Sequence, residues 1–245
     1  MGIKYDSDEA LETIGKIMEI HRNTAYETSV DLAKEKGQFP NFDWDGYSQS
    51  LFVKDLPKKL QTKIKNNGIR NCTLTTVAPT GSGAIVARVT SGVEPIFATS
   101  YQRKVKKNDS LGKEFDTFTV YHPVVQEMFG TDENLPEYVV TAHNVDPYFR
   151  VKMQGVVQRY IDSSISSTVN LAEETTVDTV ADIYMTAYKA DLKGITVYRE
   201  GSREGILITD EKSSENKDET SQNVEMKTAR NRPSITEGKT RRMRT

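Results

Sequence analysis

The residue types and spacing best suited to chemistry in this sequence lie in one segment, TLTTVAPTGSGA (73–84). β-Branched residues are followed there by a proline and then by small residues, among them Gly81 and Gly83. A turn of this composition can present several backbone N–H groups to a phosphate, and the hydroxyls of Thr80 and Ser82 add donors. The GK[ST] ending of a Walker loop is absent, so spacing alone leaves two interpretations open, an ordinary turn and a phosphate nest.

Cysteine and histidine give little further chemistry. Cys72 is the only cysteine, which excludes an internal disulfide and a Cys-rich metal site. We expect it to be a small buried hydrophobe at the start of a strand. The histidines are widely spaced, and we expect His122 and His143 at helix ends or on the surface, without a partner for acid–base work. No metal site is predicted.

Composition limits the class of protein. The chain has 245 residues, a formal net charge of −2, 36% hydrophobic residues and 28% charged residues. This apolar content is low for a compact domain, so part of the chain should not pack. No apolar run suits a membrane span or a signal peptide, which predicts a soluble cytoplasmic protein. The near-neutral charge gives no reason to expect nucleic-acid binding.

Strands and helices alternate along most of the chain, which predicts an α/β fold with partly parallel strands. Hydrophobic periodicity and capping residues predict helices over 7–37, 56–67, 122–129, 147–161 and 175–192. Strands are expected over 72–78, 95–105, 115–121, 167–171 and 195–199. The segment 39–48 is expected to be a loop. In the last helix, one apolar face is expected to hold Val177, Val180, Ile183, Tyr184 and Ala187.

The last part of the chain differs in character. Residues 209–245 are dense in charge and in Ser, Thr and Asn, with almost no aliphatic periodicity. Such a segment cannot bury enough apolar surface to offset an ordering cost of about 1–2 kcal/mol per residue. We therefore expect a folded part over 1–208 and a disordered polar linker or tail over 209–245.

Several segments carry a family resemblance in a consistent order. APTGS (78–82) is followed by SGVEPIFA (91–98). The other segments are YDSDEALE (5–12), LAKEKGQFPNFD (32–43), TAHNVDPYFRVKMQGVVQRYIDSSISSTVNL (141–171), KGITVYREGSR (193–203) and RPSITEGKTRRMRT (232–245). Together they resemble the C-terminal half of the catalytic barrel of ribonucleotide reductases, especially the class II, adenosylcobalamin-dependent ribonucleoside-diphosphate reductases. The resemblance implies a share of the family's ten-stranded α/β barrel.

The resemblance also implies roles for particular residues. The substrate diphosphate would be bound by Ala78, Pro79, Thr80, Gly81 and Ser82. Glu94 and Pro95 would shape the neighbouring turn at a possible substrate or cofactor face. Tyr198 would approach the barrel centre, with plain core packing as an equal alternative. Two positions depart from the family's usual residues: Arg150 stands where relatives usually have histidine, and Ser167 where they usually have lysine.

The same resemblance limits what this chain does alone. The family's reaction needs a radical cysteine and a further cysteine pair, and one thiol cannot supply both. We therefore expect a reductase component without catalytic residues of its own, whose partner is an N-terminal reductase chain that carries the cysteines. Adenosylcobalamin would be bound mainly with that partner, and a ribonucleotide would be the substrate. A class I enzyme with a metal-radical partner is less favoured.

Two other interpretations stay open. The chain is either a non-catalytic nucleotide-binding relic that regulates or stabilises a reductase subunit, or a piece of a longer polypeptide cut at a splicing or intein boundary. A neighbouring reading frame for the N-terminal half would favour the split enzyme, and its absence would favour the relic.

Overall fold

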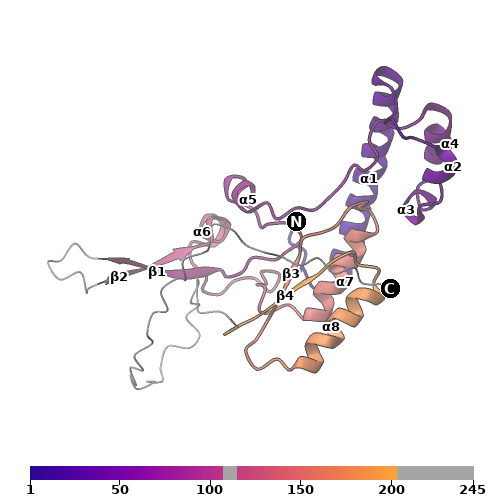
Figure 1. Cartoon of the computed structure of the whole chain (residues 1–245). Coiled ribbons are helices and arrows are strands. Elements are labelled where there is room, and N and C mark those ends of the chain that lie inside the picture. Colours follow the sequence, from indigo (N-terminus) through magenta and orange to yellow (C-terminus); the bar gives the residue numbers. More distant parts are fainter. Residues whose placement is uncertain (107–114, 203–245) are drawn as a thin grey trace, which may run out of the picture. The chain divides into compact units, whose positions relative to one another are not determined.

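The computed structural model describes residues 1–106 and 115–202 (Figure 1). The expected tail over 209–245, and with it the boundary at residue 208, lies outside these described residues. Within them, no helix has the length and apolar character needed to cross a membrane.

The first part of the chain is helical. Helix α1 (Asp8–Lys36) begins after Ser7, whose side chain accepts a hydrogen bond from the Ala10 amide, and ends at Gly37 with φ at 79°. Helices α2 (Trp44–Tyr47), α3 (Leu51–Lys54) and α4 (Lys58–Asn67) follow. Where a loop was predicted over 39–48, the structure has α2, because the Asp43 side chain accepts a hydrogen bond from the Gly46 amide. A buried cluster joins α1 to these helices: Tyr26, Val30, Val53, Leu56, Leu60, Ile64 and Ile69.

The middle of the chain contains a helix that the sequence did not predict. Helix α5 (Gly81–Ala87) follows the phosphate-loop residues directly. Strands β1 (Ser100–Lys106) and β2 (Phe115–Tyr121) then form an antiparallel pair with Ser100 opposite Tyr121. Helix α6 (Pro123–Phe129) begins after His122, which confirms the helix-end position expected for that histidine.

The last part is a parallel β-α-β unit. Helix α7 (Pro147–Gln158) leads to β3 (Thr168–Leu171), and α8 (Val177–Lys189) connects β3 to β4 (Thr196–Arg199). Strands β3 and β4 pair in parallel, with Asn170 opposite Tyr198. Between the strands and helices lies a buried cluster of Val151, Val169, Leu171, Ile183 and Ala187. The described residues thus confirm an α/β fold with a parallel pair, and their two-stranded sheets form no closed barrel.

Two expectations about burial were wrong. The segment 72–78 is not a strand: it makes a single parallel bridge, between Val77 and Ile165, and Cys72 is exposed. The reason is that the amides of Leu74 and Thr75 donate to the Asp162 carboxylate rather than to a neighbouring strand.

The apolar face of α8 is narrower than expected. Val177 is 84% exposed and Tyr184 is 47% exposed, whereas Ile183 and Ala187 are buried. At 100° per residue, Tyr184 lies roughly 80° and Val177 roughly 100° from the centre of the buried face, so they project past its edge. They are not core residues.

Candidate functional site

The five predicted phosphate-loop residues, Ala78–Ser82, are all exposed. Thr80 precedes α5, and its carbonyl accepts a hydrogen bond from Ala84 over 2.7 Å. The first amides of a helix have no acceptor within the helix, so those of residues 81–83 are free to bind a ligand. A side-chain Cβ placed on Gly81 would meet nothing within 4 Å, which leaves open space beside this backbone. The geometry is therefore compatible with close approach of a phosphate.

Asp162 fixes the chain where it enters this loop. Its carboxylate accepts hydrogen bonds from the backbone N–H groups of Leu74 over 2.6 Å and Thr75 over 3.0 Å. The Tyr26 hydroxyl donates to the same carboxylate over 2.7 Å. Val77 then exchanges backbone hydrogen bonds with the chain just beyond Asp162, at Ser164 and Ser166. The loop entry is thus attached to residues 162–166.

Glu94 fixes the chain after the loop and helix α5. Its Oε1 atom accepts a hydrogen bond from the Thr168 backbone N–H over 2.6 Å. Gly92 adopts φ of +58°, and a Cβ there would lie 3.4 Å from the Ser166 carbonyl oxygen. Glycine allows this close approach in the left-handed region, where other residues are disfavoured. Both ends of the longer segment that contains the loop, residues 74–94, therefore lie against one stretch of chain, 162–168.

Arg150 contacts the same stretch from α7. It is 3% exposed, and its Nη2 donates to the Thr168 carbonyl over 2.7 Å and to Ser167 Oγ over 3.4 Å. Its Nη1 is buried without a partner among the described residues. Arg150 and Ser167, the two positions expected to depart from the family's usual residues, are therefore in contact.

Tyr5 links the N-terminal segment to the turn after the loop. Its hydroxyl donates to the Val93 carbonyl over 2.6 Å. Burial raises the pKa of Tyr5 to about 12, Arg150 opposes the shift and Glu94 adds to it. The hydroxyl therefore keeps its proton, and its role as a donor, throughout the neutral range.

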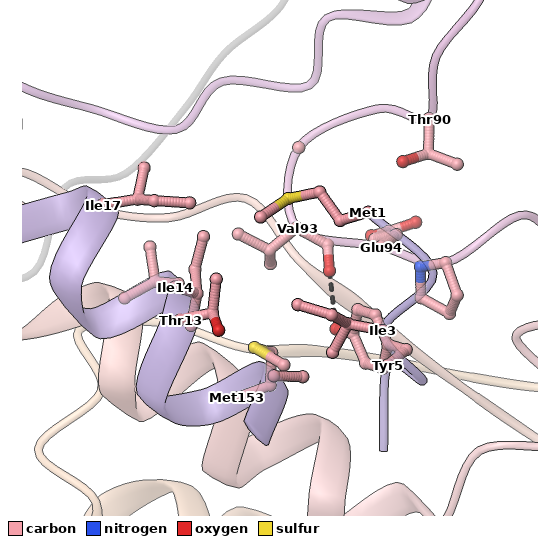
Figure 2. A pocket seen from close by; sticks show the side chains of 14 residues that line it. Met1, Ile3, Tyr5, Thr13, Ile14, Ile17, Thr90, Val93, Glu94 and Met153 are labelled. Atoms are coloured by element: carbon pink, nitrogen blue, oxygen red, sulfur yellow. Dashed lines mark hydrogen bonds between the residues drawn. The ribbon is translucent and has the colours of Figure 1, made fainter. Parts of the chain in front are cut away.

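A cavity of about 370 Å³ lies beside the same turn (Figure 2). Apolar side chains of the N-terminal segment, α1 and α7 form most of its wall, together with Glu94 and Pro95. Figure 2 shows the Tyr5 hydrogen bond to Val93 at its edge. Residues 78–82 are not part of the lining, so the cavity is separate from the predicted phosphate loop.

Tyr198 is half-buried in β4, opposite Asn170 of β3. Asn170 lies two residues beyond Thr168, which Glu94 binds. Glu94 and Tyr198 therefore both lie beside β3, whereas Ala78–Ser82 form an exposed loop.

Sequence reasoning missed several polar contacts. Asp162 and Tyr26 were not singled out, although a lone aspartate after an apolar helix was a usable signal. The expectation that His143 has no partner was wrong, because its Nδ1 lies 3.2 Å from the Glu200 carboxylate. These two residues come from separate segments, so the chain gave no local pattern for their pairing.

The sequence of this chain matches one protein family over most of its length. The family described as "Ribonucleotide reductase, barrel domain" matches residues 1–198, and the chain belongs to this family. The matched residues include the exposed loop, the stretch 162–168 and strand β3.

Three relatives illustrate the similarity. A vitamin B12-dependent ribonucleoside-diphosphate reductase of Mycobacterium tuberculosis is 33% identical over 85% of this chain and 30% of its own length. One of Thermoplasma acidophilum is 32% identical over 92% of this chain and 30% of its own length. A ribonucleoside-diphosphate reductase subunit alpha of Treponema pallidum is 29% identical over 83% of this chain and 23% of its own. The chain thus spans about 30% of the length of the first two relatives.

Proposed function

We propose that this chain is the substrate-phosphate-binding component of a ribonucleoside-diphosphate reductase, an oxidoreductase that converts ribonucleotides to deoxyribonucleotides. The observation that carries the proposal is the exposed loop Ala78–Ser82, whose backbone is open at Gly81. The longer segment that contains it, residues 74–94, is attached at both ends to residues 162–168. Family membership supports the assignment of this loop to a nucleotide.

Within this proposal, the loop binds and orients the substrate. The amides of residues 81–83 donate to the oxygens of the diphosphate, and the hydroxyls of Thr80 and Ser82 add two donors. Such contacts bring the ribose to a fixed position without taking part in bond breaking. Glu94 and Tyr198 lie beside β3 and would form part of the substrate or cofactor face next to the loop.

The chemistry itself belongs to a partner. Cys72 is the only thiol of the chain, it is exposed, and its carbonyl accepts a hydrogen bond from the Tyr47 hydroxyl. One thiol cannot become a radical and also deliver two electrons. The catalytic cysteines are therefore assigned to a chain, or a segment, equivalent to the N-terminal part of the longer relatives.

Adenosylcobalamin is the cofactor proposed, because the relatives are named vitamin B12-dependent. When bound, this group would generate the radical that starts the reaction. The cavity of about 370 Å³ is too small to enclose a corrin ring with its nucleotide. By resemblance to these relatives, we expect the cofactor to bind mainly with the partner.

The test is reconstitution. This chain and an N-terminal reductase polypeptide are purified alone and together, their stoichiometry is measured by light scattering, and ribonucleotide reduction is assayed with adenosylcobalamin and dithiothreitol. A stoichiometric complex that is active, with neither half active alone, is the expected result. A monomer that binds nucleotide but forms no complex with the N-terminal polypeptide would instead identify a nucleotide-binding relic.

The substrate loop is tested in the same complex. Gly81→Val places a branched side chain in the open space beside the loop and should raise KM for the nucleotide about tenfold or more. Val86→Ala is the matched control, because Val86 is 85% exposed on α5 and its side chain lies outside the proposed contacts. Equal KM values for the two variants would contradict the phosphate-binding role.

A further inference from the structure

Residues 76–93, the segment that contains the phosphate loop, are attached at both ends to the stretch 162–168. At each end, a carboxylate accepts hydrogen bonds from backbone N–H groups. At the entry, Asp162 of this stretch accepts from Leu74 and Thr75 of the loop side. At the exit, Glu94 of the loop side accepts from Thr168 of the stretch. The two attachments therefore run in opposite directions, and they enclose residues 76–93.

The exit attachment occupies a position where a strand would otherwise pair. Thr196 of β4 donates its amide to Ser167, so the backbone groups of the next residue, Thr168, face away from β4. The single bridge with Val77 ends at Ser166, and Pro79 has no N–H to continue it. Glu94 accepts from the Thr168 N–H and Arg150 donates to the Thr168 carbonyl, so two charged side chains take the place of the missing strand.

We infer that Asp162 and Glu94 are positioning residues, which set the separation and orientation of the two ends of the phosphate loop. This inference rests on the proposed function of the loop. The loop makes few contacts of its own, since nearly all residues from 78 to 89 are exposed and only Ala84 is buried. Its conformation therefore depends on where its ends are held, and a hydrogen bond to a charged carboxylate is stronger than one to a neutral oxygen.

The substitutions separate acceptor loss from charge loss. Glu94→Ala removes the acceptor, whereas Glu94→Gln keeps an amide oxygen that can still accept from Thr168. In Asp162→Asn, one of the two backbone amides of Leu74 and Thr75 keeps an oxygen acceptor. The other amide faces the N–H₂ group of the asparagine, which cannot accept a hydrogen bond. Glu174→Ala and Asp182→Ala are matched controls, because both carboxylates are exposed and lie away from the loop.

The first measurement is amide hydrogen exchange on the full chain. Removal of either carboxylate should speed exchange of the hydrogen-bonded amides of residues 84–89 by about tenfold, while the core amides of α7 and β3 beyond Thr168 keep their rates. Glu94→Gln should restore slow exchange. Unchanged exchange over 84–89 in both Glu94→Ala and Asp162→Asn would overturn the inference.

The second measurement is binding of pyrophosphate and of a ribonucleoside diphosphate by calorimetry, well below the melting temperature of each variant. Affinity should fall about tenfold in Glu94→Ala and Asp162→Asn, fall less in Glu94→Gln, which keeps a neutral acceptor, and stay at the wild-type value in the controls. Wild-type binding that no variant changes would refute the positioning role. Failure of the wild-type chain to bind either probe, alone or with its partner, would instead refute the proposed function, and the exchange rates would still decide whether the carboxylates order the loop.

Discussion

Tyr5 is the residue whose ionisation bears most directly on the turn after the phosphate loop. Its hydroxyl donates to Val93, and burial raises its pKa to about 12, above the ordinary 10.0. The folded state therefore favours the protonated phenol. This contribution to stability is fully present below pH 10 and is lost as the pH rises toward 12.

Tyr5→Phe should make the chain less sensitive to alkali. A pKa difference of two units corresponds to about 2–3 kcal/mol, part of which is lost by pH 10.5. Urea unfolding at pH 8 and pH 10.5 should show a smaller fall in unfolding free energy for the variant than for the wild type. At pH 8 the variant itself should lose about 1 kcal/mol with the hydrogen bond.

Tyr26 gives the comparison for this result. Its pKa is also raised, by burial first and then by its hydrogen bond to Asp162, so part of the alkaline sensitivity should remain in Tyr5→Phe. Equal losses in the wild type and the variant would mean that Tyr5 ionises freely in the folded chain and does not secure the turn at Val93.

At the scale of elements, α8 shows how a helix divides its residues between core and solvent. Ile183 and Ala187 pack against α7 and the strands, and Val177 lies beyond the edge of this buried face. Residue type alone does not distinguish these positions. The difference follows from where each residue falls around the helix relative to Ile183 and Ala187.

Truncation of two α8 residues should therefore have unequal effects. Ile183 is 0% exposed, and Ile183→Ala should cost about 2–5 kcal/mol because it removes buried methyl groups and leaves a cavity. Val177→Ala should change stability by less than about 0.5 kcal/mol. Urea unfolding of both variants measures the difference. Comparable losses would place Val177 in the core, as the sequence had predicted.

The long elements were predictable, and the interruptions were not. Helices α1, α7 and α8 follow apolar periodicity and capping residues such as Ser7, and β3 and β4 follow short β-branched runs. Residues 72–78 have strand-like composition, but Asp162, far along the chain, takes the amides that a strand would have used. Propensity is local, so a distant side chain that binds the backbone cannot be inferred from it.

In the candidate site, too, some features were predictable from the sequence and others were not. The exposed loop is recognisable from APTGS, because its composition is itself the signal. Glu94 was singled out, but its bond to Thr168 and the attachment at Asp162 depend on which segments meet in the fold. The partner of His143, Glu200, was missed for the same reason.

At the scale of the whole molecule, the parallel pair has an open edge. Thr196 and Glu200 donate their amides toward β3, and backbone groups alternate along a strand, so those of Val197 and Arg199 face away from it. No further strand of the described residues pairs with this edge of β4. An unpaired edge is a template for another strand, and the chain spans about 30% of the length of its relatives. We therefore expect the partner to add a strand at β4.

Val197→Pro tests this expectation. Proline removes the N–H that faces away from β3 and is tolerated best on an edge strand. The variant should keep its pairing with β3 and lose about tenfold or more of its affinity for the N-terminal partner, because a backbone hydrogen bond is lost and the ring obstructs the incoming strand. Titration of the labelled partner measures affinity, and circular dichroism measures the melting temperature.

Two controls make the result specific. Val197→Thr keeps the amide and the β-branched shape, so it should bind the partner like the wild type. Tyr188→Ala alters a side chain that is 76% exposed on α8, away from the strand edge, and should also leave affinity unchanged. If Val197→Pro binds as tightly as Val197→Thr at equal folded fractions, the partner does not extend the sheet at β4. The two halves would then associate through helix faces rather than through a continuous sheet.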